Sequence, residues 1–240
     1  MTSDTRGTGA SEAGTLYVVG TPIGNLEDLS PRGARVLGEV ILVAAEDTRR
    51  TQALLTHLGI RKPLIAVYAE VERSRSGRVL EALTGGDVAL CTDGGMPAIS
   101  DPGAFLVNSA RAAGHVVVVI PGPTAVASAL AASGFSADRF IFLGFLPRKQ
   151  TQMTAAFLEL EDERRTVVAY ESPHRLLKAL DTISTTLADR RVAVARELTK
   201  VHEEVRVATA EVLAAHYREH PPRGEVTIVI EGRPRSPRTT

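Results

Sequence analysis

Charged residues follow several short apolar runs in this chain, in turns that also contain glycine or proline. Glu46, Asp47, Arg49 and Arg50 crowd into one such turn, AEDTRRT (44–51). The other turns are GTPIGN (20–25), TDGGMPAISDPG (92–103), PGPTA (121–125), YESPHR (170–175) and ARELTK (195–200). Any one of them alone is more typical of an ordinary structural turn. Open α/β sheets bind ligands at the carboxyl ends of their strands, so six such turns together predict one ligand-binding cleft between two domains.

The first of these turns is similar to a nucleotide-binding loop but lacks a lysine. Leu16–Val19 leads into the loop 20–24, and Ser30 followed by Pro31 is typical of a helix start. A strand, a glycine loop and a helix N-terminus usually form an anion or nucleotide site. This loop has neither the Gly-Lys-Ser/Thr of a P-loop nor the third glycine of a dinucleotide fingerprint, so a different ligand is expected.

The other reactive residue types narrow the function further. The histidines have no metal-ligand spacing, so we expect no metal. Ser100 lies in no recognisable nucleophile motif. The single Cys91 fits a reducing cytoplasm, and its place at the end of an apolar run predicts a buried, inert thiol. We expect no secretory signal and no membrane span. The net charge is zero, so a nucleic-acid site must be a local patch.

Alternating strands and helices are expected to position these turns. In the first half, strands are predicted at 16–19, 40–44, 64–68, 88–91 and 116–120, and helices at 32–37, 49–58, 77–83, 104–113 and 124–132. This alternation favours a mostly parallel sheet with helices on both faces. Runs such as HVVVVIPG are apolar at every position, as in strands that are buried on both faces.

The second half predicts a smaller α/β domain with more hairpin character. Strands are expected at 140–143, 166–170, 192–195, 205–208 and 226–230, with helices at 153–160, 175–187 and 209–220. The stretch SGFSADRF (133–140) breaks the rhythm between the halves. We therefore expect an N-terminal domain over 15–134 and a C-terminal domain over 138–232, with disordered tails at 1–14 and 233–240.

Seven segments, in this order, closely resemble the ribosomal small-subunit methyltransferase I family of the tetrapyrrole-methylase-like class: VVGTPIGNLEDLS, AAEDTRRT, ISDPG, IPGPTA, GFLPRK, YESPHRLL and ARELTKVHEE. The resemblance runs from Leu16 to Gly232. It implies two α/β domains of the tetrapyrrole methylase type, with a parallel sheet first, a mixed sheet second and the cofactor cleft between them. It also implies a cytoplasmic, homodimeric enzyme that uses S-adenosylmethionine to methylate the ribose 2′-oxygen of cytidine C1402 in 16S rRNA of the small ribosomal subunit.

The resemblance accounts for the missing lysine, because S-adenosylmethionine has no phosphate. Gly20 and Gly24 would then let the backbone approach the cofactor, and Pro22 would form a rigid wall. The residues implied to contact the cofactor are Pro22, Gly24, Met96, Ile99, Ser100, Thr124, Ala125, Tyr170 and Thr209.

A general base should assist the reaction that the resemblance implies, because a ribose hydroxyl is a weak nucleophile. The candidates are Glu46, Asp47, Asp101, Glu171 and Glu197. Asp101 and Glu171 are preferred as catalytic residues, because both follow strands that flank the implied cofactor. Each carboxylate is about as well suited to holding a loop through backbone N–H groups.

RNA phosphates would meet the cations in or beside the six turns. These are Arg49, Arg50, Arg148, Lys149, Arg175, Arg196 and Lys200, with Tyr68, Phe145 and Tyr170 available for base stacking. The alternative is that Arg49 simply pairs with Asp47, and Arg196 with Glu197.

The chain departs from the family pattern at four positions. Met96 and Ala98 replace a threonine and a glycine, and Ala69 and Val71 replace two histidines. Two other functions stay open: a methylase of the same fold acting on a tetrapyrrole or other small acceptor, and a non-catalytic RNA-binding or ribosome-assembly module. The arginine-rich turns oppose the first, and the intact glycine loops oppose the second.

Overall fold

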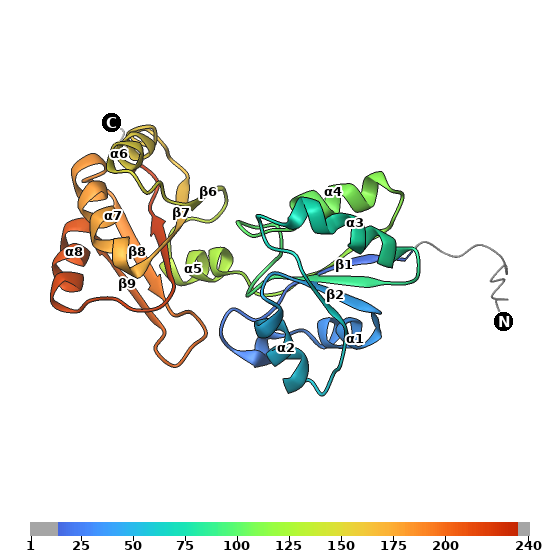
Figure 1. Ribbon diagram of the computed structural model, residues 1–240. Helices are drawn as coiled ribbons and strands as arrows, with labels where there is room; N and C mark the ends of the chain where they lie inside the picture. The colour runs from blue at the N-terminus through green and yellow to red at the C-terminus, as the bar shows by residue number, and fades with distance from the viewer. Residues whose placement is uncertain (1–13, 235–240) are drawn as a thin grey trace, which may run out of the picture. The chain divides into compact units, whose positions relative to one another are not determined.

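The computed structural model describes residues 14–234 and divides into two compact units (Figure 1). The first unit comprises the chain up to Pro22 and Leu26–Gly122, and the second comprises Ile23–Asn25 and the chain from Pro123 onward. The predicted tails lie outside the described residues, apart from residue 14 and residues 233–234. The contacts assign the helix at 125–133 to the second unit, whereas the sequence places it in the first domain.

The first unit is built around a five-stranded parallel sheet, as predicted. Its strands are β1 (Leu16–Val19), β2 (Leu42–Ala45), β3 (Leu64–Ala66), β4 (Val88–Cys91) and β5 (Val117–Ile120), in the order β3-β2-β4-β1-β5. The four strand pairs are all parallel, so the turns that follow β1, β2, β4 and β5 emerge at one edge. This shared edge brings together residues that are far apart in the sequence.

Helices cover both faces of this sheet (Figure 1). They are the 3₁₀ turn Leu26–Asp28 and helices α1 (Pro31–Glu39), α2 (Thr48–His57), α3 (Glu72–Leu83) and α4 (Ala104–Ala112). Side chains of α1 and α2 form one core with Val43 and Cys91, and side chains of α3 and α4 form another with Leu90. Strand β4 is fully buried because it lies in the middle of the sheet with helices on both sides, which accounts for its unbroken apolar run.

The second unit contains a mixed five-stranded sheet, also as predicted. Its strands are β6 (Phe140–Phe145), β7 (Thr166–Glu171), β8 (Arg191–Arg196), β9 (Glu204–Thr209) and β10 (Val226–Ile230), in the order β6-β7-β10-β8-β9. Only β6 and β7 are parallel. Helix α5 (Ala125–Ser133) packs on one face, and α6 (Gln150–Leu158), α7 (Pro173–Thr186) and α8 (Ala210–Glu219) cover the other.

Cys91 is fully buried at the end of β4, which confirms the prediction of an inert thiol. Burial raises the pKa of this thiol to about 12, so the reactive thiolate is not formed near neutral pH. Within residues 14–234, no helix is long and apolar enough to cross a membrane.

A buried glutamate from another helix caps the N-terminus of α4. Glu72, the first residue of α3, accepts hydrogen bonds from the backbone N–H groups of Gly103 at 3.0 Å and Leu106 at 2.9 Å. The side chain of Glu72 therefore does over a long range what an N-cap residue does locally. It also fixes the end of the loop 92–103, which leads directly into α4.

We expect Glu72→Ala to lower the free energy of unfolding by about 2 kcal/mol, because two backbone N–H groups lose their acceptor inside the protein. Urea denaturation measures this change. Glu70→Ala is the control, because Glu70 is an exposed residue of the same segment. Equal effects of the two substitutions would contradict the capping role.

Candidate functional site

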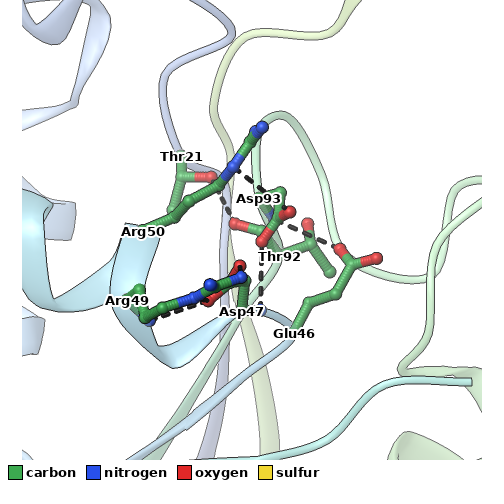
Figure 2. A network of polar contacts seen from close by, with 7 residues as sticks. All are labelled: Thr21, Glu46, Asp47, Arg49, Arg50, Thr92 and Asp93. Carbon is green, nitrogen blue, oxygen red and sulfur yellow. Dashed lines mark hydrogen bonds and ion pairs between the residues drawn. The ribbon is translucent and has the colours of Figure 1, made fainter.

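The turns after β2 and β4 are fastened to each other by two carboxylates (Figure 2). Asp93 Oδ1 accepts a hydrogen bond from the backbone N–H of Asp47 at 3.0 Å, and Glu46 Oε2 accepts one from the backbone N–H of Asp93 at 3.2 Å. Thr21, after β1, donates its hydroxyl to the carbonyl of Thr92 at 3.2 Å. The carboxyl edge of the sheet is therefore a connected polar network.

Two arginines neutralise only part of the negative charge in this network. Arg49 forms a bidentate pair with Asp47, in which Nη2 lies 2.7 Å from Oδ2 and Nε lies 3.1 Å from Oδ1. This confirms the predicted Arg49–Asp47 ion pair, which lowers the pKa of Asp47 to about 2. Arg50 Nε lies 3.6 Å from Asp93 Oδ2. Within residues 14–234, neither Glu46 nor Asp101 forms an ion pair with a cation.

Asp101 is the most perturbed carboxyl at this edge. Burial, together with the negative charges of Glu46 and Asp93, raises its pKa from 3.8 to about 6. The pKa of Glu46 is also raised, first by burial. The folded protein holds the Asp101 proton more tightly than the unfolded chain does, so stability decreases as the pH rises from about 4 to about 6. Asp101 therefore titrates in the range expected of a general base that operates near neutral pH.

Gly20 is required by the packing of the neighbouring turns. A Cβ at Gly20 would lie 2.6 Å from the backbone nitrogen of Gly122 and 2.6 Å from the sulfur of Met96. The next residue, Thr21, exchanges two backbone hydrogen bonds with Gly95, each of 2.9 Å. These contacts bring together the turns that follow β1, β4 and β5.

The loop 92–103 contains several residues in the left-handed region. Gly95 has φ 88° and Gly103 has φ 132°, but Ala98 at φ 68° and Ser100 at φ 64° carry a side chain. The N–H of Ala98 donates to the carbonyl of Pro102 at 3.1 Å and closes the loop. A left-handed alanine costs about 1–2 kcal/mol relative to glycine, which accounts for the glycine in the family pattern at this position.

Glu171, at the end of β7, forms a strong ion pair in the second unit. Its carboxylate accepts hydrogen bonds from Nε and Nη2 of Arg175 at 2.8 and 2.6 Å. It also accepts one from the backbone N–H of Ser172 at 2.7 Å. Arg175 Nη2 donates further to the carbonyl of Leu146 at 2.7 Å. Glu171 is 3% exposed, so the arrangement is a buried clamp around the start of α7.

The ARELTK turn, between β8 and β9, is also held by a carboxylate. Glu197 Oε1 accepts from Lys200 Nζ at 3.0 Å and from the backbone N–H of Glu225 at 2.9 Å. Burial raises the pKa of Glu197, but these two donors outweigh it and leave the pKa lowered. Glu197 and Thr199 are left-handed, with φ 51° and 67°. Strain of this kind, in residues other than glycine, is often found at functional sites.

The predicted cofactor-binding residues fall in both units. Pro22, Met96, Ile99 and Ser100 belong to the first, and Gly24, Thr124, Ala125, Tyr170 and Thr209 belong to the second. A Cβ at Gly24 would lie 2.5 Å from Lys200 Cγ, so the missing side chain leaves room for the ARELTK turn. The cofactor contacts remain predictions.

Thr209 lies at the far end of the second sheet from Tyr170 and Glu171. It pairs with Arg191 at the start of β8, whereas Glu171 lies level with Val226 and Arg196 at the other end. The two ends of β8 are roughly 17 Å apart. Thr209 is the N-cap of α8, and its hydroxyl accepts from Val212 N at 3.5 Å. The strand register therefore does not bring Thr209 together with Tyr170.

Most of the predicted RNA-binding cations have a carboxylate partner. Besides the pairs of Arg49, Arg50, Arg175 and Lys200, Arg196 Nε lies 3.4 Å from Glu204, and not beside Glu197 as the alternative supposes. For Arg148 and Lys149, residues 14–234 offer no ion pair within 4.0 Å. Phe145 is 63% exposed and its ring centroid lies 5.4 Å from that of Tyr170, so an aromatic surface is present beside β6 and β7.

Sequence reasoning missed Asp93, Thr21 and Glu72. Asp93 lies two residues after a buried strand, and that position was a usable signal. The role of Glu72 had no signal, because its partners are more than thirty residues away.

The fold and the site define a class of methyltransferase. Residues 15–214 match the family model "Tetrapyrrole (Corrin/Porphyrin) Methylases". The fold is similar to that of a cobalamin biosynthetic enzyme, cobalt precorrin-4 methyltransferase, with a TM-score of 0.69, 18% identity and coverage of 93% of this chain and 97% of the other. Uroporphyrin-III-C-methyltransferase from Thermus thermophilus gives a TM-score of 0.59 at 23% identity, covering 90% of this chain and 94% of that one.

Curated relatives narrow the class. The chain is 47% identical over 226 residues to "Ribosomal RNA small subunit methyltransferase I" of Pseudomonas aeruginosa, covering 92% of this chain and 79% of the relative. It is 43% identical to the Thermotoga maritima protein of the same name, covering 92% of this chain and 99% of that one. The chain belongs to the ribosomal RNA small subunit methyltransferase I family of the tetrapyrrole methylases, and it is an S-adenosylmethionine-dependent methyltransferase.

The charge of the carboxyl edge of the first sheet fits this cofactor. S-adenosylmethionine has a sulfonium and an ammonium but no phosphate, so carboxylates and backbone groups are the protein groups suited to bind it. Glu46 and Asp101 supply carboxyls whose pKa values are raised chiefly by burial, and a bound cation would favour their ionised forms. Around them, the tightly packed backbones of Gly20 and Gly122 and the half-exposed Ile99 supply close-lying main chain and apolar surface.

We expect Ala98→Gly to raise the free energy of unfolding by about 1 kcal/mol, because it relieves the left-handed strain of Ala98. Urea denaturation at constant slope measures the change. The same substitution at Ala53, exposed within α2, is the control and should lower stability by about 1 kcal/mol. A loss of stability at both positions would show that Ala98 is not strained.

Proposed function

We propose that this protein transfers a methyl group from S-adenosylmethionine to the ribose 2′-oxygen of cytidine C1402 in 16S rRNA of the small ribosomal subunit, with Asp101 as the general base. The rRNA substrate is supported by relatives at 43–47% identity whose names specify the small-subunit RNA. The observation that carries the role of Asp101 is its raised pKa, about 6, at the carboxyl edge of the first sheet.

Asp101 is better suited to accept a proton than the other carboxylates. Asp47 is bound by Arg49 on both oxygens, and Glu171 is bound by Arg175 and by a backbone N–H. The oxygens of both carboxylates are therefore already occupied by donors within the protein. We therefore assign Glu171 a positioning role at the start of α7 rather than the base role predicted with Asp101.

In the proposed reaction, bound S-adenosylmethionine supplies a methyl group activated by its positively charged sulfur. The carboxylate of Asp101 takes the proton of the 2′-hydroxyl, which makes the oxygen a better nucleophile. Glu46 raises the pKa of Asp101 by its negative charge, so it tunes the base. Glu46 and Asp101 together favour a cationic donor at this edge.

A small-molecule acceptor is the main alternative, because the two solved structures named above are methyltransferases of corrin and porphyrin biosynthesis. Their identity of 18–23% supports a shared fold but no shared acceptor. The proposed base is Asp101, so this mechanism does not call on the two histidines that Ala69 and Val71 replace. We propose further that the enzyme is a cytoplasmic homodimer, as the family resemblance implies.

The deciding experiment measures transfer of labelled methyl groups to small ribosomal subunits from cells that lack this protein. Asp101→Asn should lower the rate by about 10²–10⁴-fold at saturating S-adenosylmethionine, with the saturating concentration set by calorimetry. The wild-type rate should rise with pH and level off above about 6. Glu46→Gln should move this limb to lower pH, because it removes a charge that raises the pKa of Asp101.

Glu39→Gln is the control, because Glu39 is an exposed residue of α1 that pairs with Arg35. A pH profile that is the same in the Glu46→Gln variant and the wild type would remove Asp101 as the base. Label in a base instead of a ribose 2′-O-methylcytidine would contradict the proposed position. Cofactor binding without label on either subunits or naked 16S rRNA would favour a small acceptor.

A further inference from the structure

A hollow of about 460 Å³ opens in the second unit, beside the ARELTK turn. Its walls come from the end of β8, the first half of β9, the end of α8 and the segment 220–223. The charged and aromatic side chains that decide its chemistry are Arg196, Arg206, Arg223, Glu204, His216 and His220. Of these, the sequence predicted an RNA contact for Arg196 alone.

One carboxylate orients two of the arginines. Glu204 receives Arg206 Nε at 2.7 Å, Arg196 Nε at 3.4 Å and the hydroxyl of Tyr217 at 3.2 Å. Burial raises the pKa of Glu204, but these donors outweigh it and leave the pKa lowered. Glu204 is therefore ionised at neutral pH, and two guanidinium groups share its single negative charge.

The third arginine adds an unbalanced positive charge. The backbone carbonyl of Arg223 accepts from Arg196 Nη1 at 3.3 Å, which holds the segment in place. The guanidinium of Arg223 has no ion pair within residues 14–234. Glu197, which also lines the hollow, is paired with Lys200 at 3.0 Å. The lining contains three arginines and two glutamates, so the positive charges outnumber the negative charges by one.

The lining suits a phosphate better than a metal ion. No group of His, Cys, Asp and Glu in residues 14–234 has the arrangement of a metal site. Arginine, in contrast, is the side chain whose planar fork matches phosphate oxygens. Beside the arginines, the rings of His216 and His220 stack with centroids 4.6 Å apart, and His220 is exposed. A cationic wall next to a flat ring pair is typical of surfaces that bind the backbone and bases of single-stranded RNA.

We propose that this hollow binds a phosphodiester of single-stranded RNA, and that Arg206 and Arg223 contact the rRNA substrate there. The inference rests on the proposed rRNA substrate. The volume exceeds what one phosphate ion fills and lies in the range of small-molecule pockets, so a nucleotide unit within a chain fits it.

The test is binding of a fluorescent single-stranded RNA oligonucleotide, followed by anisotropy over a series of salt concentrations. Arg206→Ala with Arg223→Ala should weaken binding roughly tenfold at about 0.1 M salt. The slope of log K against log salt should shrink by about 0.7 for each arginine that contacts a phosphate. Arg223→Lys should restore most of the slope lost in Arg223→Ala, because it keeps the charge.

Arg218→Ala is the matched control, because Arg218 lies on α8 but pairs with Asp181 at 2.5 Å and does not line the hollow. Arg223→Ala is the variant least able to disturb the fold, since no side-chain bond is lost. Calorimetry with S-adenosylmethionine should give wild-type affinity for every variant, which shows that the site for the donor is intact.

Each other outcome overturns the proposal in a distinguishable way. Normal RNA affinity and salt slope in the double variant, with wild-type methyl transfer intact, would remove the hollow as an RNA contact and leave the proposed function standing. Adenosine monophosphate bound by the wild type and lost in the double variant, without a change in RNA binding, would assign the hollow to a free nucleotide. Wild-type protein that neither binds RNA nor methylates small subunits would overturn both proposals.

Discussion

The carboxyl edge of the first sheet depends on acidic side chains that bind the backbone of neighbouring turns. The carboxylate of Glu46 accepts a hydrogen bond from the N–H of Asp93, and the carboxylate of Asp93 accepts one from the N–H of Asp47. These bonds fix two turns, but they also concentrate negative charge at this edge. Within residues 14–234, ion pairs with Arg49 and Arg50 offset part of that charge. Burial, together with the remaining negative charge of Glu46 and Asp93, raises the pKa of Asp101.

Carboxylates also fix turns in the second unit, but there they are paired with cations. There the carboxylates of Glu171, Glu197 and Glu204 each meet at least one Arg or Lys, and they hold the starts of turns and helices in place. Left-handed residues at 197 and 199 are tolerated because Lys200 and the backbone of Glu225 fix the turn around them. Other cations of this unit have no carboxylate partner within residues 14–234, and a surface that contacts RNA phosphates requires such cations.

Local sequence patterns were enough to predict the fold, but they were insufficient to predict parts of the site. Buried runs such as 88–91 and 226–230 predicted their strands to the residue, because nearly every position in them is apolar. Contacts that join distant turns were not encoded locally. Thr209 was predicted to contact the same cofactor as Tyr170, yet the antiparallel register of β8 and β9 sets it at the other end of the sheet. Register depends on pairing between strands, which no single segment reveals.

The burial of Cys91 has a practical consequence. The chain contains one cysteine, and its thiol is enclosed in the first unit with a pKa of about 12. Maleimide and disulfide reagents attack thiolates at the surface, so the native protein behaves towards them as if it had no cysteine. A cysteine introduced at an exposed position of either unit is then the sole reactive thiol, and a spectroscopic label can be attached there without first altering β4.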